Sequence, residues 1–411
     1  MDHPDHRRIG RELGVYASEE LCGAGFPLWL PGGAAIRSEI ERFVIDLERR
    51  AGYHHVYSPV LGRLELYQRS GHWQHYQDNM FPPMEVGGER VLLRPMLCPH
   101  HILVFSHQPR GLRDMPYRVA ELGAQFRLER SGVVGGLSRT RQMTLNDGHV
   151  FCPADQIEEE IGTILAMVET AYRALAIPPP SYRLSLGGQG PKYVGDRQMW
   201  RRAEDMARAA LEGLGLAYSE AAGEAAFYGP KIDLQVRDPR GREETLSTVQ
   251  IDFHLPRQFG LEFRRGSETE MPVMLHRSIV STMERMVAHV LEVHDGRLPL
   301  WLSPVQVVVV PVSAEAASYA RRVGAALVGA GVRAEVDDRE ETLSARVRLA
   351  HDRMVPCIAV VGEREVAAGS VTLRLRGHEE PVALALGSFA SWLTELTAGM
   401  EAGLRPPEPP A

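Results

Sequence analysis

The sequence of 411 residues contains no long uncharged apolar stretch, and its most apolar segment, residues 305–310, which includes Gln306, has only the length of a strand. A helix that spans a membrane needs about 20 such residues, so no membrane span is predicted. The amino terminus is charged from its second residue and lacks the apolar core of a signal peptide. Four cysteines, far apart in the chain, are too few for a disulfide framework, which favours a reducing compartment and a cytoplasmic protein.

An excess of basic charge is also missing, because 46 Lys and Arg face 53 Asp and Glu, for a formal net charge of -7. This balance excludes a histone-like or polybasic binder, so any nucleic acid must meet a local basic patch. Residues 110–141 form such a patch, with seven arginines against three acids. Lysines are scarce, and Lys192 and Lys231 are the only two. A lysine kept in an arginine-rich chain hints at a site that needs a compact ammonium group.

Hydropathy patterning predicts an α+β domain followed by a smaller α/β domain. Helices are expected at residues 35–49, 156–175 and 197–214, and long paired strands at 118–129 and 142–152. Further strands are expected at 55–61, 90–95, 227–236, 244–253 and 272–276. After residues 294–304, strands and helices alternate, which indicates a module with a parallel core. The domains are assigned to residues 1–300 and 303–400, with a disordered tail at 401–411.

Local nucleotide and metal motifs are absent: the sequence has no Walker loop, no G-x-G-x-x-G, no paired C-x-x-C and no H-E-x-x-H. Spacing alone therefore identifies no enzyme. One stretch of interest is residues 126–129, where a strand would place Arg127 and Glu129 on one face. That pairing suits a phosphate beside a base or amine, and the alternative is a cross-strand ion pair.

Two further stretches concentrate polar residues. In residues 145–149, period two places Asp147 and His149 on one strand face, where Asp147 can orient His149 or bind a substrate amine. The alternative is a histidine with satisfied hydrogen bonds in the core. In residues 271–285, a strand ends at His276, and Arg285 is expected one to two turns inside the following helix.

The order of these stretches resembles the catalytic core and anticodon-binding domain of class II aminoacyl-tRNA synthetases, most closely the threonyl-tRNA synthetase family. The resemblance runs from Asp5 to Leu396. It is carried by DHRRIGREL at 5–13, a first class II motif that ends at Ser58 and Pro59, GHW at 71–73, RPMLCPHH at 94–101, FYGPKID at 227–233 and TVQIDF at 248–253. The family implies an antiparallel sheet of about seven strands that holds ATP, and an α/β anticodon-binding domain after it.

The resemblance also implies site residues, position by position. The implied zinc ligands are Cys98, His149 and His276, a set that leaves zinc an open position. The implied amino-acid-binding residues are Asp147, Tyr228 and Gln250. The implied catalytic residues are Arg127, Arg285 and Lys231. The implied ATP-binding residues are Arg127, Glu129, Arg139, Met143, Gln250 and Arg285. The implied anticodon-binding residues are Glu340, Glu365 and Arg374.

These residues imply ATP-dependent ligation of threonine to tRNA(Thr) through a threonyl-adenylate, with one Zn²⁺ per chain and Mg²⁺ bound with ATP. A homodimer is expected, because the first class II motif at residues 35–59 packs across a two-fold axis in the family and its helix here carries an apolar stripe. The chain opens where the family's catalytic region starts, so we expect no editing domain, and uncorrected misacylation with serine.

Several positions depart from the family: Gln142, Met143, Leu145, Asn146 and Ser281 replace glycine, phenylalanine, glutamine, aspartate and glycine, and Glu340 replaces asparagine. They leave three alternatives: a divergent paralogue that tolerates an inhibitor, an amino-acid ligase for a carrier protein or small amine, and a non-catalytic tRNA-binding regulator. Retention of the zinc ligands with Arg127 and Arg285 disfavours the regulator, and retention of the second domain disfavours the carrier ligase.

Overall fold

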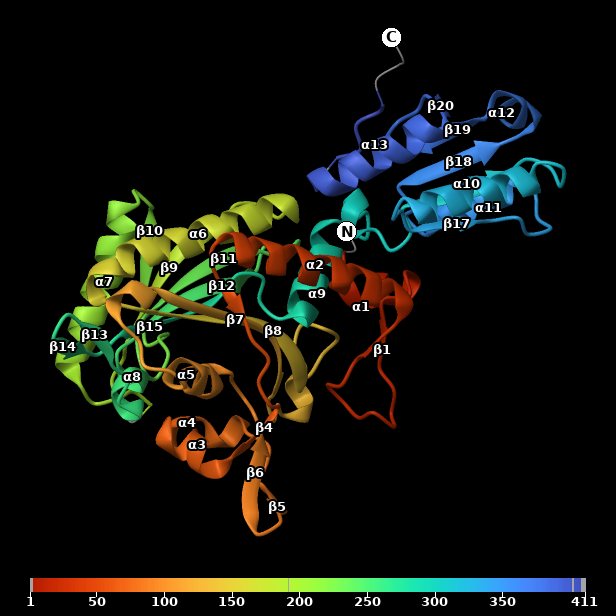
Figure 1. Ribbon diagram of the computed structural model, residues 1–411. Coiled ribbons are helices and arrows are strands. Elements are labelled where there is room, and N and C mark those ends of the chain that lie inside the picture. The colour runs from red at the N-terminus through yellow and green to blue at the C-terminus, as the bar shows by residue number, and fades with distance from the viewer. Residues whose placement is uncertain (1–2, 191, 401–402, 408–411) are drawn as a thin grey trace.

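The computed structural model describes residues 3–190, 192–400 and 403–407. Its larger part is built on an eight-stranded sheet (Figure 1). The strands lie in the order β10 (Tyr218–Ala222), β9 (Ser181–Leu186), β11 (Lys231–Arg237), β12 (Glu243–Asp252), β15 (Val273–Ser278), β8 (Gln142–Cys152), β7 (Tyr117–Phe126) and β3 (His54–His55). The five pairings from β9 to β7 are antiparallel, and the outer pairs β10 with β9 and β3 with β7 are parallel. The α+β class with an antiparallel sheet is therefore confirmed, with one strand more than expected.

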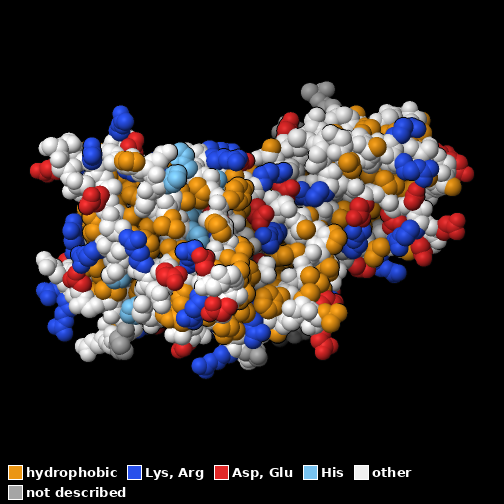
Figure 2. Space-filling model, turned by 60° about the horizontal axis from the view of Figure 1, so that its bottom comes forward, with side chains coloured by type: hydrophobic (Ala, Val, Ile, Leu, Met, Phe, Trp, Pro, Cys, Tyr) orange, Lys and Arg blue, Asp and Glu red, His pale blue; other side chains and the backbone are white. Residues whose placement is uncertain are grey.

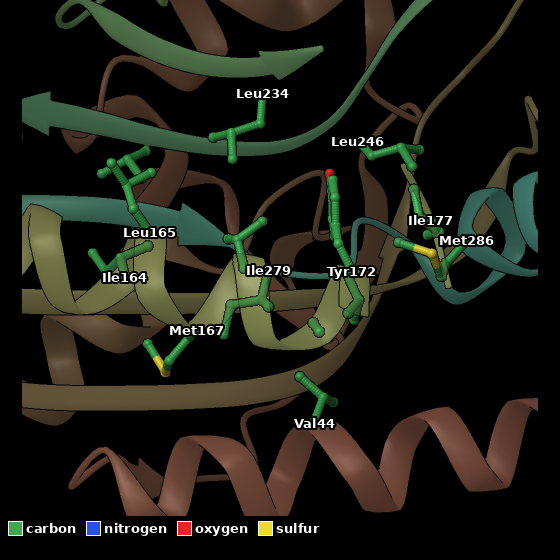
Figure 3. Packing of buried hydrophobic residues seen from close by; sticks show 14 of the residues in the cluster. Val44, Ile164, Leu165, Met167, Tyr172, Ile177, Leu234, Leu246, Ile279 and Met286 are labelled. Carbon is green, nitrogen blue, oxygen red and sulfur yellow. The ribbon is translucent and has the colours of Figure 1, made fainter. Parts of the chain in front are cut away.

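Alternating side chains of the strands enter separate cores on the two faces of the sheet. Val150 and Leu275 pack with α2 (Pro31–Arg50), α6 (Ile157–Ala174), α7 (Arg197–Gly213) and α9 (Met283–Val293). Phe151 and Met274, one residue away, pack instead with α5 (Cys98–Ser106) and α8 (His254–Phe259). Figure 3 shows the first core, where Ile164 and Tyr172 of α6 lie against strand residues such as Leu234. Both faces of the sheet are thus covered, because consecutive apolar residues of a strand point to opposite faces.

The helix α2 follows from its sequence, since Ile36, Ile40, Phe43 and Val44 recur at helical spacing and Pro31 stands in its first turn. All four apolar side chains are buried in the core of this chain. The expectation that this stripe packs across a two-fold axis is therefore wrong, because the stripe has no free surface.

Smaller elements surround the central sheet. A three-stranded sheet of β4 (Leu61–Arg63), β6 (Glu89–Leu93) and β5 (Met84–Val86) projects from it with α3 (Leu64–Arg69) and α4 (His72–Tyr76) beside it (Figure 1). The remaining elements of this part are α1 (His6–Glu12), β1 (Tyr16–Ala17), β2 (Leu28–Trp29), β13 (Phe263–Arg265) and β14 (Glu268–Glu270).

The carboxy-terminal part is a five-stranded sheet in the order β17 (Ala334–Val336), β16 (Val307–Pro311), β18 (Cys357–Val361), β19 (Ser370–Leu375) and β20 (Val382–Ala385). The first three strands are parallel, as the alternation of strand and helix predicts, whereas β19 and β20 are antiparallel additions. Its helices are α10 (Ala317–Gly329), α11 (Leu343–Asp352), α12 (Glu363–Ala368) and α13 (Leu386–Gly399).

Two local predictions fail. The expected strand at residues 55–61 is divided between β3 and β4, which belong to different sheets. The expected strand at 227–236 begins only at Lys231, so Tyr228 lies in the preceding loop. The tail predicted to be disordered lies outside the described residues except for 403–407. No helix in the described ranges has the length and apolar character to cross a membrane.

One arginine ties the carboxy-terminal part to the rest of the chain. The Arg333 guanidinium pairs with Glu39 of α2 at 2.6 Å and donates to the carbonyl oxygens of Trp301 at 2.6 Å and Ser303 at 2.9 Å. Trp301 is itself buried against Phe43, with ring centroids 5.7 Å apart. The connection between the two sheets is therefore anchored at both ends.

Replacement of Arg333 by Met should lower the free energy of unfolding by about 2 kcal/mol, because hydrogen bonds from a charged donor are lost while the aliphatic stem remains. Urea unfolding and proteolysis between residues 294 and 306 measure the effect. The matched control is Arg339→Met, which removes an exposed ion pair with Asp337 and should change stability by less than about 1 kcal/mol. Equal unfolding midpoints for the two variants would contradict the role of Arg333.

Candidate functional site

One face of the central sheet carries the predicted strand residues of the site. Register pairs His149 of β8 with His276 of β15, His276 with Gln250 of β12, and Gln250 with Lys231 of β11. Residues directly opposite on neighbouring strands point to the same face, and Asp147 joins them by period two. Four strands thus place these side chains on the face of the sheet that α5 covers. Helices α2, α6 and α9 cover the other face.

Cys98, His149 and His276, which we call the ligand trio, meet on this face. Cys98 is the first residue of α5, and all three side chains are buried. Each offers one ligand atom, and these atoms lie within 4.8 Å of one another. His149 Nε2 lies 3.0 Å from His276 Nδ1. A thiolate and two imidazoles form a donor set that zinc uses, with a position left for another ligand.

Burial shifts the pKa of two members of the trio. It raises the pKa of the Cys98 thiol well above its ordinary value and lowers the pKa of His149 well below its own. Both groups are therefore neutral near pH 7 when no cation is bound. A metal ion that binds the thiolate displaces its proton, so binding and deprotonation are coupled.

Tyr228 closes one side of the trio. Its ring stacks on His276 with centroids 4.6 Å apart, and its hydroxyl donates to Gln250 Oε1 at 2.6 Å. Phe227 continues the wall, with its ring centroid 4.9 Å from His75. Burial raises the pKa of Tyr228, so the phenol stays protonated and remains a hydrogen-bond donor.

Asp147 stands beside the trio, with Oδ1 3.6 Å from His149 Nε2. Its other oxygen accepts from Gln125 Nε2 at 3.4 Å, and Gln125 Oε1 accepts from Arg127 at 3.2 Å. Burial raises the pKa of the Asp147 carboxyl. A chain of hydrogen bonds therefore connects the surroundings of the trio to Arg127.

Arg127 and Arg285 are arginines without acidic partners among the described residues. The guanidinium of Arg285 has neither a hydrogen bond nor an ion pair there, and burial lowers its pKa. Arg127 donates only to Gln125 and to the carbonyl oxygen of Pro95. These two cations lie near one another and neither forms an ion pair with an acid of the described residues, although Glu244 attracts Arg285 at longer range. Such a pair suits an anionic ligand.

Two predictions about these arginines need correction. Strand β7 ends at Phe126, so Arg127 and Glu129 do not share a strand face, and a turn joins them in which the Glu129 N–H donates to the Arg127 carbonyl. Arg285 lies in the first turn of α9, where its backbone N–H donates to the capping Thr282 hydroxyl at 3.1 Å. Both residues nevertheless lie at the ends of elements, where side chains reach a ligand.

The remaining predicted residues have partners. Lys231 Nζ lies 3.2 Å from Asp233, and Arg139 pairs with Glu129 at 2.9 Å. Met143 is buried opposite Gln125, on the same face as the trio. Arg118 of the predicted basic patch is bound to Glu160 at 2.6 Å, so fewer arginines are free for nucleic acid than the sequence suggested.

The predicted anticodon residues lie in the carboxy-terminal part. Glu340 is exposed between β17 and α11, and Arg374 is exposed on β19. The Glu365 carboxylate accepts from the Gly362 N–H at 2.9 Å and from the Thr372 hydroxyl at 2.8 Å. Glu365 therefore caps α12 in this structure.

The changed positions Asn146 and Ser281 belong to a buried polar cluster behind the trio. Asn146 donates to Glu48 at 2.7 Å and accepts from the Ile279 N–H at 3.0 Å. Glu48 also lies 2.7 Å from Arg277, and both of these side chains are fully buried. Ser281 keeps the left-handed conformation that favours glycine, with φ of 57°.

Sequence reasoning missed three polar residues that support the trio: His101, Glu121 and Asp252. Asp252 Oδ2 lies 2.8 Å from His276 Nε2, and His101 Nδ1 lies 2.7 Å from His149 Nδ1. Their roles depend on contacts between strands and a helix that are distant in the chain, so only the register could have indicated them.

Comparisons with known proteins identify two matching family models. The model described as tRNA synthetase class II core domain (G, H, P, S and T) matches residues 84–294, and the anticodon binding domain model matches residues 306–396. A threonine--tRNA ligase from Halalkalibacterium halodurans is 47% identical over 94% of this chain and 60% of its own length. Another from Lactiplantibacillus plantarum is 47% identical over 95% of this chain and 61% of its own length. This chain thus spans about three fifths of the curated relatives that it matches.

A solved structure gives the same result for the fold. The RNA binding domain of threonyl-tRNA synthetase from Cryptosporidium parvum Iowa II is 32% identical and superposes with a TM-score of 0.91. The match covers 95% of this chain and 98% of that one.

Replacement of Glu48 by Gln should lower the free energy of unfolding by about 3–5 kcal/mol, because it leaves the Arg277 charge buried without a partner. Thermal and urea unfolding measure the loss. Glu41→Gln on the same helix is the control, since its pair with Arg37 is partly exposed and is worth less than about 1 kcal/mol. Similar losses in the free energy of unfolding for both variants would show that the buried pair of Glu48 and Arg277 contributes no more than the partly exposed pair.

Proposed function

Because this chain belongs to the class II aminoacyl-tRNA synthetase family, we propose that it activates threonine with Mg²⁺-ATP and ligates it to tRNA(Thr). The observation that carries this proposal is the ligand trio, three potential metal ligands from separate elements gathered on one sheet face. The relatives named threonine--tRNA ligase support the choice of amino acid. We assign residues 1–300 to catalysis and 303–400 to anticodon binding.

We assign zinc to the trio. The fit rests on the facing nitrogens of His149 and His276, 3.0 Å apart, with the Cys98 thiol beside them. When bound, zinc supplies a Lewis-acidic position that takes amino and hydroxyl groups. Threonine offers both groups, whereas valine lacks the hydroxyl.

Three residues beside the trio bind the amino acid in this proposal. Asp147, 3.6 Å from His149, accepts from the threonine hydroxyl or amine. Tyr228 and Gln250, joined at 2.6 Å, contact the amine from the other side. The arrangement selects a small side chain that carries a hydroxyl.

Activation joins a carboxylate oxygen of threonine to the α-phosphorus of ATP while the bond from that phosphorus to the pyrophosphate oxygen breaks. Arg127 and Arg285, which have no acidic partners among the described residues, stabilise the negative charge that spreads over the phosphoryl oxygens. Lys231 adds a third cation, and Glu129, Arg139, Met143 and Gln250 hold the nucleotide. Catalysis is mainly positioning and electrostatics, because the carboxylate needs no deprotonation.

The adenylate then passes threonine to a ribose hydroxyl at the tRNA terminus, and AMP leaves. Glu340, Glu365 and Arg374 are proposed to contact the anticodon. Glu365 can do so only if it gives up part of its capping of α12 or offers its unshared lone pairs. The family core speaks for an enzyme over a regulator, and the second domain for tRNA over a carrier protein.

The activity is tested by pyrophosphate exchange with a panel of amino acids, followed by charging of tRNA. Exchange that depends on threonine together with formation of threonyl-tRNA is the expected result. Exchange without charging would favour the carrier ligase, and an absence of both would favour the non-catalytic regulator.

A homodimer is also proposed, on an exposed apolar groove next to Ser58 and Pro59. Tyr57 is 94% exposed and Leu103 47% exposed at this groove, which Leu66 and Val104 also line. Hydrophobic side chains reach the surface between charged ones on the face in Figure 2. A second copy is the proposed occupant, because the groove is continuous with the end of the first class II motif.

Metal analysis should find about one zinc per chain in the unaltered protein and none in Cys98→Ala, because two imidazoles alone hold zinc weakly. Cys357→Ala, a buried cysteine in the carboxy-terminal sheet, is the matched control and should keep its zinc. Full threonine activation by metal-free protein would contradict the proposed role of zinc in binding the amino acid.

Arg127→Ala and Arg285→Ala should each lower pyrophosphate exchange by about 100-fold or more, since each removes a charged contact to the transferring phosphoryl group. Arg113→Ala is the control, because that side chain is 93% exposed and should not affect exchange. Unchanged exchange in either of the first two variants would make that arginine a structural residue.

Leu103→Glu should shift the protein from dimer to monomer, because it places a charge in the apolar groove. Light scattering at micromolar concentration measures the mass against 45.6 kDa for one chain. Leu21→Glu alters a fully exposed leucine outside the groove lining and should leave the mass unchanged. A monomeric unaltered protein with full activity would contradict the homodimer.

A further inference from the structure

We propose that Glu121 is a positioning residue for the metal site, acting through His101 on the ligand His149. This inference rests on the proposed zinc site and adds a function for two residues, Glu121 and His101, that are not themselves proposed to bind the metal ion. His101 Nδ1 lies 2.7 Å from His149 Nδ1, and His101 Nε2 lies 3.3 Å from Glu121 Oε2. All three side chains are buried, so water cannot replace these hydrogen bonds.

The direction of the hydrogen bonds follows from the carboxylate. An ionised carboxylate only accepts, so a neutral His101 carries its proton on Nε2 and leaves the lone pair of Nδ1 free. His149 then has to donate from Nδ1, which leaves the lone pair of Nε2 directed at the trio. Glu121 thus selects, across one imidazole, the tautomer of His149 that can bind a metal ion.

The other histidine ligand is selected in the same way. Asp252 Oδ2 accepts from His276 Nε2 at 2.8 Å, which leaves His276 Nδ1 as the free lone pair. The two selected nitrogens, His149 Nε2 and His276 Nδ1, then face each other at 3.0 Å. Two lone pairs at this distance repel each other unless a cation lies between them. Glu121, through His101, and Asp252 therefore direct both histidine lone pairs toward one position, where a metal ion can bind.

Glu121 is itself held in the ionised state. Burial alone would raise the pKa of its carboxyl, but hydrogen bonds from His101 and Ser58 and the charge of Arg94 hold it at about 2. Arg94 lies 2.9 Å from Oε1, and the Ser58 hydroxyl donates to Oε2 at 2.6 Å. The carboxylate is therefore an acceptor near neutral pH.

The test is zinc affinity, measured by competition with a chelator on the full chain, in Glu121→Gln and in a control. Gln is isosteric but its amide nitrogen cannot accept from His101, so zinc should bind about 10- to 100-fold more weakly. The visible spectrum of the Co²⁺-loaded protein should change as well. Glu160→Gln is the control, because it also leaves an arginine, the partly buried Arg118, without its buried carboxylate partner but touches no histidine.

A second variant covers the case in which Glu121→Gln does not fold. Glu121→Asp keeps the charge opposite Arg94 but withdraws the carboxylate from His101, so zinc affinity should fall with little loss of stability. Equal zinc affinity and equal Co²⁺ spectra in the unaltered protein and the folded Glu121 variants would overturn the positioning role alone. An unaltered protein that binds no zinc would overturn the metal site together with this inference.

Discussion

The antiparallel pairing of β8 with β15 is the constraint on which the site depends. Its register sets His149 directly opposite His276, and the neighbouring pairing of β8 with β7 sets Glu121 opposite Asp147. Side chains alternate between the faces of a sheet, so a slip by one residue would send every one of them to the other face. Burial of both faces under separate cores makes such a slip costly, because apolar and charged residues would exchange places.

Strands β8 and β15 carry residues of a buried polar cluster on one face of the sheet and residues of the candidate site on the other. Asn146 and Arg277 point toward α2, where Glu48 completes a buried cluster with satisfied charge. The residues next to them, Asp147 and His276, point toward α5 and the trio. Gly148 permits this arrangement, because a Cβ there would lie 2.2 Å from the Arg277 guanidinium. The ion pair on the other face of the sheet therefore helps fix the backbone that carries His149 and His276 of the ligand trio.

Part of this could be predicted from residues alone. Period two in 142–152 correctly placed Asp147 and His149 on one face, and the resemblance brought Cys98 and His276 to them before any contact was known. The interruption between β3 and β4 was missed because apolar residues at 56–61 resemble one strand, although Pro59 breaks its pairing. Arg127 was placed on a strand because nothing local marks the end of β7 at Phe126. Glu121 and His101 escaped notice because their roles exist only across elements distant in the chain.

The ion pairs of this arginine-rich chain separate arginines that have acidic partners from one that has none within ion-pair distance. The two most deeply buried arginines have acidic partners: Arg94 has Glu121, and Arg277 has Glu48. A folded chain gains from such pairing, because an unpartnered buried charge costs several kcal/mol. Arg285 is only partly buried, yet burial lowers its pKa, and no acid of the described residues lies within ion-pair distance of its guanidinium, while Glu244 acts on it at longer range. In the proposed function, an anionic substrate group such as a nucleotide phosphate pairs with this cation at the first turn of α9.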